Sequence, residues 1–415
     1  MYPKHYFAFA IFMFKIGGYY DPNYAKTNFL RRFHRAYNLF VYASCPIYYS
    51  TVELLMLYYT SRSSLYVFVD HVGMIFVHVV GTIKLVFLLT NMKLIKKVMR
   101  IIKDIKYESY GEFQPGNIFL AHCTFTSRIC YIYIFVGSLI PLINQFKASI
   151  KFIDQRHQLE VGNVTCKEIM PYYSVFPFGS ATLNWCIVEF IVQSIPMNTY
   201  VYLIGAFDVN FVFMLAYLRA HFHCIRGTFE TIRERCLVRL GLPEDYETIV
   251  DSENPKLEAE IQMEVLKVTK HMQTIIRICE ALKDLYLIPL LYEAISVIGI
   301  LISCLYVMSL EPLLSLEAYG RFQYALALFW QLSLYCFYAC EITNSALLVT
   351  EGIYFMKWYS CTKSIKSILV FNTMRMQRTI EFTVGKFAPL NLTTYLQILK
   401  GTYTYYTFLS KKGQM

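Results

Sequence analysis

Several ionisable side chains lie inside long apolar stretches of this sequence. They are Glu53, Asp70, His71, His78, Lys84, Glu189, Glu293 and Glu341. A charged group in an apolar environment is costly unless it has a partner, so each should face protein or water. Lys84 lies near one end of its stretch, where its long side chain can extend outward to a polar interface. For the others, pairing within the protein is a better expectation than contact with a ligand.

Motifs for catalysis or metal binding are absent from the sequence. It contains no Walker sequence, no GxGxxG, no HExxH and no GxSxG. His221 and His223 are two residues apart, so a helix places them on different faces. No carboxylate-rich segment adjoins them. We therefore expect no enzyme activity, no cofactor and no bound metal.

The last apolar stretch, 389–410, contains many polar side chains. They are Asn391, Thr393, Thr394, Gln397, Lys400, Thr402, Thr404 and Thr407. Hydroxyl and amide groups need water or protein partners, so this helix cannot face lipid on all sides. Thr404, Phe408 and Lys412 follow at four-residue spacing and share one helix face. A water-filled path closed by the Phe408 ring fits this pattern. A helix buried at the centre of a bundle fits it equally well.

The composition indicates that lipid, not water, is the solvent for most of the chain. Of its 415 residues, 56% are hydrophobic and 16% are charged, with a mean hydropathy of +0.39. Soluble proteins average about 45–50% apolar and about 25% charged residues. This excludes disordered chains, collagens, disulfide scaffolds and most soluble enzymes. The net charge of +10 is not gathered in a basic polar domain with exposed aromatic residues, which argues against nucleic-acid binding.

Seven apolar stretches are long enough to cross a bilayer as helices, which predicts an all-α membrane protein. They cover 37–60, 65–90, 129–146, 184–218, 285–310, 322–350 and 389–410. Most of the 39 lysine and arginine residues lie in the segments 1–36, 91–128, 219–284 and 351–388. Positive charge marks the cytoplasmic side, so the N-terminus should be cytoplasmic and the C-terminus extracellular.

This topology divides the chain into six parts. We expect a cytoplasmic N-terminal segment (1–36), four membrane helices with an extracellular loop at 147–183 (37–218), cytosolic anchor helices with a loop (219–284), two further membrane helices (285–350), the anchor part of the seventh helix (351–388), and the seventh membrane helix with the extracellular C-terminus (389–415). The loop contains a sequon for N-glycosylation at Asn163.

The twelve cysteines include no CxxC pair, and most lie in apolar or basic segments. We expect them to be buried or cytosolic thiols. The 35 Tyr, 32 Phe and 3 Trp residues must partly form belts at the membrane interfaces. Others could line an apolar cavity for a volatile, weakly polar ligand, since ring faces offer contact area without requiring hydrogen bonds.

The C-terminal segment from Thr383 to Leu409, TVGKFAPLNLTTYLQILKGTYTYYTFL, closely resembles the terminal signature of insect odorant receptors. Looser similarities are HMQTIIRICEALKDL, FDVNFVFMLAYLRAHF, KIGGYYDPNYAKTNFLRRFHRAYNLF and YCFYACEITNSALLVTEGIYFMKWY. Together these segments cover most of the chain. They resemble a ligand-tuning member of the family rather than its shared co-receptor.

The resemblance implies an odorant-gated, non-selective cation channel subunit in the plasma membrane of sensory neurons. Its partners would be a small volatile ligand, the lipid bilayer and a co-receptor subunit, in a heterotetramer whose four final helices surround one pore. By family position Thr404, Phe408 and Lys412 would line that pore, with Phe408 at the gate. Lys411 and Lys412 depart from this pattern, because positive charge at the outer mouth opposes cation entry.

The resemblance also implies an odorant pocket in the outer half of the bundle, between the second, third, fourth and sixth segments. Candidate lining residues are His71, Met74, Ile75, Gly137, Ser138, Pro141, Trp185, Tyr324 and Trp330. A gustatory-type channel of the same superfamily is the alternative. From a different class, a G-protein-coupled receptor is also possible, but the charge distribution opposes its topology. A membrane enzyme or transporter ranks third.

Overall fold

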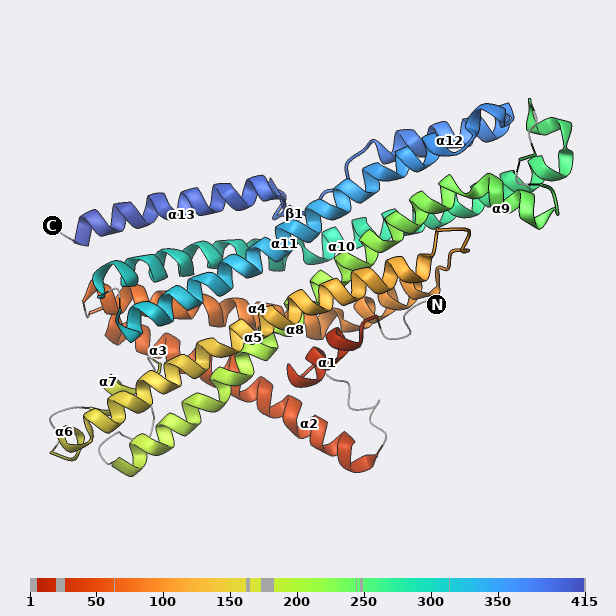
Figure 1. The fold of residues 1–415 in the computed structure, drawn as a ribbon. Helices are drawn as coiled ribbons and strands as arrows, with labels where there is room; N and C mark the ends of the chain where they lie inside the picture. The colour runs from red at the N-terminus through yellow and green to blue at the C-terminus, as the bar shows by residue number, and fades with distance from the viewer. Residues whose placement is uncertain are drawn as a thin grey trace.

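The computed structural model is almost entirely helical (Figure 1). It describes residues 6–19, 27–62, 64–161, 165–172, 183–243, 245–246, 249–312 and 314–413, and only the backbone of 160, 167–168 and 409–413. The helices are α1 (Ala8–Ile16), α2 (Asn28–Tyr42), α3 (Ser50–Thr60), α4 (Leu65–Asp104), α5 (Pro115–Asp154), α6 (Arg156–Val161), α7 (Cys166–Ile169), α8 (Leu183–Glu230), α9 (Ile232–Arg239), α10 (Pro255–Leu310), α11 (Leu316–Phe355), α12 (Lys363–Met376) and α13 (Leu392–Gly413). The strands are β1 (Thr383–Val384) and β2 (Ala388–Pro389).

Six helical segments within the described residues are long and apolar enough to span a membrane. They are Asn28–Thr60, α4, α5, α8, α10 and α11, which correspond to the first six predicted spans. The predicted all-α membrane fold is thus confirmed. The seventh predicted span forms α13, which is a separate helix but contains too many polar residues to meet the same hydropathy criterion.

The first span is not a regular α-helix. A π-helical segment, Ala43–Tyr49, joins α2 to α3 and contains Pro46. Proline has no amide hydrogen to donate and its ring crowds the preceding turn, which accounts for the irregular segment here. Figure 1 shows α2 projecting away from the main bundle beyond this point.

The ends of the long helices follow from local sequence signals. Ser64 and Ser315 cap α4 and α11 by accepting hydrogen bonds from the backbone amides of Val67 and Ala318. Asn254 caps α10 in the same way, and Pro255 occupies its first turn. These caps satisfy amides that have no partner inside the helix.

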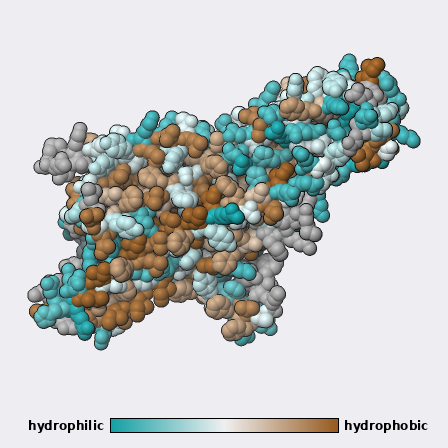
Figure 2. Space-filling model, in the orientation of Figure 1, coloured by the Kyte–Doolittle hydropathy of each residue, from teal (hydrophilic) through white to brown (hydrophobic). Residues whose placement is uncertain are grey.

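Helix α8 forms the core of the bundle. In its most apolar stretch 83% of the residues are buried, compared with 17% in α5. It contacts α1, α4, α5, α10 and α11. Figure 2 shows hydrophobic residues over the middle of the bundle and hydrophilic residues gathered at the α9 and α12 end, as expected for a chain surrounded by lipid.

A network of ion pairs holds the α9 and α12 end together, and we call this part the charged end. Arg239 on α9 pairs with Glu260 and Glu264 on α10, and with Glu108 between α4 and α5. Burial disfavours the charged form of Glu108, but hydrogen bonds from Lys267 and Arg239 outweigh this effect and lower its pKa to about 2. Arg375 on α12 pairs with Glu280 on α10.

A short antiparallel hairpin of β1 and β2 interrupts the chain between α12 and α13. Gly385 and Lys386 at its turn have positive φ angles of 56° and 65°, and the Phe387 amide donates to the Val384 carbonyl. The sequence did not predict this hairpin. After the hairpin, α13 continues in the general direction of α12 and packs along α10 and α11 (Figure 1).

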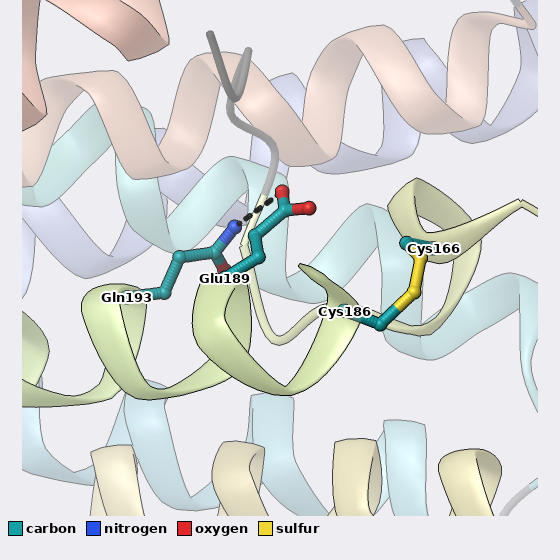
Figure 3. The surroundings of a disulfide bond; sticks show 4 residues. All are labelled: Cys166, Cys186, Glu189 and Gln193. Carbon is teal, nitrogen blue, oxygen red and sulfur yellow. Dashed lines mark hydrogen bonds between the residues drawn. A yellow bond between two sulfur atoms is a disulfide. The ribbon is translucent and has the colours of Figure 1, made fainter. Parts of the chain in front are cut away.

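One cysteine pair contradicts the expectation of free thiols. Cys166 on α7 and Cys186 at the start of α8 form a disulfide, with Cα atoms 5.6 Å apart (Figure 3). The two cysteines are 20 residues apart in sequence, and this spacing alone does not reveal that they pair. The other ten cysteines are free. We call this end of the bundle the disulfide end.

We predict that Cys166 and Cys186 resist alkylation in unreduced protein and become reactive after reduction and unfolding. Mass spectrometry of a non-reducing digest should detect the linked peptides. Replacing Cys166 by serine should make Cys186 available to alkylation, with Cys361, a free cysteine at the charged end, as the internal comparison. Alkylation of both residues in unreduced, unfolded protein would contradict the disulfide.

Candidate functional site

A cavity of about 120 Å³ lies between α4, α5, α8, α10 and α11. Its wall is mainly aliphatic and aromatic, with the lining residues Met74, Val77, Val80, Ile134, Ile140, Met197, Val201, Ile204, Val297, Ile300, Tyr324, Ala327 and Leu328 among others. Engineered apolar cavities of about 150 Å³ bind molecules the size of benzene. The cavity therefore suits a small, largely apolar ligand.

A buried group of three charged residues forms one part of the cavity wall. Lys84 Nζ on α4 lies 2.7 Å from Asp208 Oδ1 on α8 and 2.7 Å from Glu293 Oε2 on α10. Lys84 and Glu293 line the cavity, and all three are at least 95% buried. We call these residues the charged triad. It connects three helices that are far apart in sequence.

Asp208 accepts four hydrogen bonds, from Lys84 and from three uncharged side chains near the triad. Besides Lys84, the Tyr335 hydroxyl donates to Oδ1 at 2.5 Å. The Tyr133 hydroxyl and the Gln331 amide donate to Oδ2 at 2.5 and 2.7 Å. A buried carboxylate persists only when its lone pairs are satisfied in this way. The triad and its donors therefore join α4, α5, α8, α10 and α11.

The position of Lys84 corrects one expectation from the sequence. Its side chain is fully buried and does not extend outward to a polar interface, because two carboxylates inside the bundle bind it. The sequence-based set of ionisable residues also omitted Asp208. A carboxylate within the apolar run FDVNFVF is the same signal that identifies Glu293, so it could have been found.

The remaining intramembrane ionisable groups do face protein, as predicted. The His78 ring lies against Glu53, and both side chains are 2% exposed. His71 Nδ1 is 2.8 Å from the Thr60 hydroxyl. Gln193 donates to Glu189 near the disulfide (Figure 3). Glu341 pairs with Arg219.

A second, more polar cavity of about 420 Å³ lies on the disulfide-end side of the first. The two share Met74, Asn144, Tyr172 and Arg321 in their walls. Arg321 on α11 is 2.5 Å from Asp70 on α4 at this boundary. An ion pair thus lies where the two cavities adjoin.

The structure divides the nine predicted pocket residues into two groups. Met74, Gly137, Pro141 and Tyr324 line the inner cavity. The other five lie outside its wall. His71 contacts Thr60, the Ser138 hydroxyl donates to its own helix at Ile134, and Trp185 is 43% exposed at the start of α8. Ile75 and Trp330 are partly buried on α4 and α11.

Helix α13 packs against α10 and α11 and leaves its opposite face uncovered. Thr402 is buried against the bundle, whereas Thr404 and Phe408 are exposed, Phe408 by 66%. The hydroxyls of Thr402 and Thr404 donate to carbonyls of their own helix, so they need no water. The side chain of Lys412 and the residue Asn163 lie outside the described residues.

His221 and His223 take separate places, as their spacing predicts. His221 Nδ1 is 2.9 Å from the Tyr107 hydroxyl, and the residue is fully buried. His223 stacks on His122 of α5. Within the described residues there is no group of three side chains that could hold a metal ion.

We predict that replacing Lys84 by methionine destabilises the fold by about 3–5 kcal/mol, because two buried carboxylates lose the cation that pairs with them. Thermal unfolding of the purified protein in detergent measures the change. Lys151→Met is the matched control, since Lys151 forms an exposed ion pair with Glu317 that is worth about 0–1 kcal/mol. Equal unfolding temperatures for the two variants would contradict a structural role of the triad.

The fold has counterparts among solved structures. It is similar to two structures of the insect olfactory receptor OR5 from Machilis hrabei, one of them described as a complex with eugenol, with TM-scores of 0.73 and 0.72. The alignments cover 98% of this chain and 98–99% of that receptor, at 12% sequence identity. At this identity the similarity concerns the fold alone.

Sequence comparisons lead to one family. The chain is 26% identical to odorant receptor 22c of Drosophila melanogaster over 215 residues, 51% of this chain and 52% of that protein. It is 27% identical to odorant receptor 10 of Aedes albopictus over 81 residues, 20% of this chain and 22% of that protein. The aligned segments thus span about half and about a fifth of these relatives. The family model described as 7tm Odorant receptor matches residues 64–403, and the chain therefore belongs to the odorant receptor family.

Proposed function

We propose that this chain is a subunit of an odorant-gated, non-selective cation channel that assembles with a co-receptor. The observation that carries the proposal is the apolar inner cavity enclosed by five helices, two of which, α10 and α11, also pack against α13. As a member of the odorant receptor family the chain is a receptor and not an enzyme.

Ligand binding can reach α13 through these two helices. The cavity wall includes Val297 and Ile300 on α10 and Ala327 on α11. A ligand that binds better to one arrangement of α10 and α11 shifts the population towards that arrangement. Because α13 packs on both helices, its position changes with them. This gives a route from the cavity to the terminal helix.

The uncovered face of α13 is the proposed pore lining. Thr404 and Phe408 lie on this face, one helical turn apart, and the helix bears no described neighbour there. In an assembly, copies of α13 from several subunits would surround an axis, and the Phe408 rings would form an apolar constriction. Lys412 follows on the same face by sequence spacing.

The proposed orientation places the N-terminus in the cytosol and the C-terminus outside. The disulfide supports it, since disulfides persist in oxidising compartments. It joins Cys166, in the loop predicted to be extracellular, to Cys186 at the adjoining end of the fourth predicted span. The charged end, which carries the ion pairs of Arg239 and Arg375, then lies in the cytosol. The proposed location is the plasma membrane of sensory neurons.

We predict that volatile compounds evoke a cation current in cells that express this chain with an odorant co-receptor, and none with the co-receptor alone. Gly137→Phe should abolish that current. A Cβ atom at Gly137 meets only Val201, at 3.5 Å, so the backbone tolerates the change while the added ring fills the cavity. Whole-cell recording measures both results.

Ala121→Phe is the control for added bulk, because Ala121 is exposed on the same helix, α5. It should leave the evoked current unchanged. A response that requires G-protein signalling, or an undiminished current in Gly137→Phe at equal surface expression, would count against the proposal.

We predict that Phe408→Ala raises the resting conductance of the assembled channel, because removal of the ring widens the constriction. Recording without stimulus, with co-receptor present, measures this leak. Phe371→Ala is the matched control, since Phe371 is 68% exposed on α12, far from the proposed pore. If the resting conductance of Phe408→Ala equals that of the control, Phe408 is not part of the gate.

A further inference from the structure

The charged triad gives the inner cavity a polar wall with more hydrogen-bond acceptors than donors. One ammonium group, Lys84, faces two carboxylates, Asp208 and Glu293. Lys84 lines the cavity, but the residue is 0% exposed and both carboxylates hold its ammonium group. The polar atoms available to a ligand are therefore those of its neighbours.

The donors next to the triad are already engaged. The Tyr133 hydroxyl and the Gln331 amide both line the cavity, and both donate to Asp208. The Tyr335 hydroxyl donates to the same carboxylate. With these groups directed at Asp208, the wall has no free donor among the described residues of the triad and its contacts.

Glu293 is the acceptor with spare capacity. Asp208 accepts four hydrogen bonds, but Lys84 is the one partner recorded for Glu293 within the described part of the chain. An ionised carboxylate accepts about four hydrogen bonds. Glu293 also lines the cavity, and 5% of its side-chain surface remains accessible. A ligand can therefore approach a carboxylate that accepts fewer hydrogen bonds from the protein than it could.

We infer that Glu293 selects ligands that carry a hydrogen-bond donor, a hydroxyl or a protonated amine, on an otherwise apolar body. The donor binds the Glu293 carboxylate at the triad, and the apolar body contacts the wall around Ile134, Val297 and Ile300. The buried excess of carboxylate over ammonium favours such a donor electrostatically, and it disfavours a ligand that presents only acceptors. This inference rests on the proposed role of the cavity.

The geometry of the cavity fixes the orientation of such a ligand. Met74, near the boundary with the outer cavity, and Lys84 are ten residues apart on α4, or about 15 Å along the helix. A ligand that enters from the disulfide end reaches the triad last. The end of the ligand that carries the hydrogen-bond donor must therefore enter first, and the apolar body must lie nearer the disulfide end.

Binding to the purified full chain in detergent tests the inference separately from channel activity. The probes are a straight-chain primary alcohol, the primary amine and the methyl ether of the same length, and thermal stabilisation reports binding. Wild-type protein and Glu293→Gln are compared for each probe. Because each compound is compared with itself, its partition into detergent cancels.

We expect Glu293→Gln to weaken binding of the alcohol, the amine or both by about ten- to hundredfold, the range for one hydrogen bond to a charged group. Binding of the ether should change by less than about twofold, since it has no donor for the carboxylate. A larger loss for the amine identifies a cationic ligand, and a larger loss for the alcohol a neutral one. Glu280→Gln, the same substitution at the charged end of α10, should affect none of the three.

Equal effects of Glu293→Gln on all three probes, or none on any, would overturn the inference. A wild-type protein that binds the ether as tightly as the alcohol and the amine would also overturn it, even if the variant does not fold. The proposed function has its own readout. An odorant-evoked current that Gly137→Phe abolishes would stand although donor selectivity failed.

Discussion

The bundle depends on one buried electrostatic interaction, the pairing of Lys84 with Asp208 and Glu293. A lone ammonium or carboxylate at this depth would cost several kcal/mol, so none of the three helices can place its charge there without the others. Apolar packing alone fixes relative position weakly in a membrane, because lipid tails are as apolar as side chains. The triad and the donors around Asp208 therefore specify how α4, α5, α8, α10 and α11 fit together.

The same interaction shapes the candidate site. The cavity is enclosed by the five helices that the triad connects, and it ends at the triad itself. Aliphatic and aromatic side chains form most of the wall, which suits an apolar ligand, and the triad adds one polar boundary. Structural and recognition roles thus fall on neighbouring residues: Asp208 is saturated by protein donors, whereas Glu293 retains capacity for a ligand.

The two ends of the molecule are stabilised by different chemistry. At the disulfide end a covalent bond joins α7 to α8, and the Arg321–Asp70 pair lies between the two cavities. At the charged end, ion pairs link α9, α10, α12 and the segment before α5. Helix α13 lies apart from both, packed on two helices with one face uncovered. A helix held so loosely by its own chain is suited to contacts in an assembly.

The sequence alone determined the class of the fold, because apolar length and helix caps are local properties, and it predicted six of the spans and the separate polar terminal helix. The residues from Thr383 onward likewise indicated the resemblance to odorant receptors. Tertiary structure decided what depends on residues distant in the chain. It joined Cys166 to Cys186, buried Lys84 between two carboxylates, brought in the overlooked Asp208, and selected four of the nine predicted pocket residues for the cavity wall. Helix periodicity defines the face on which a residue lies, but only packing decides which helix covers that face.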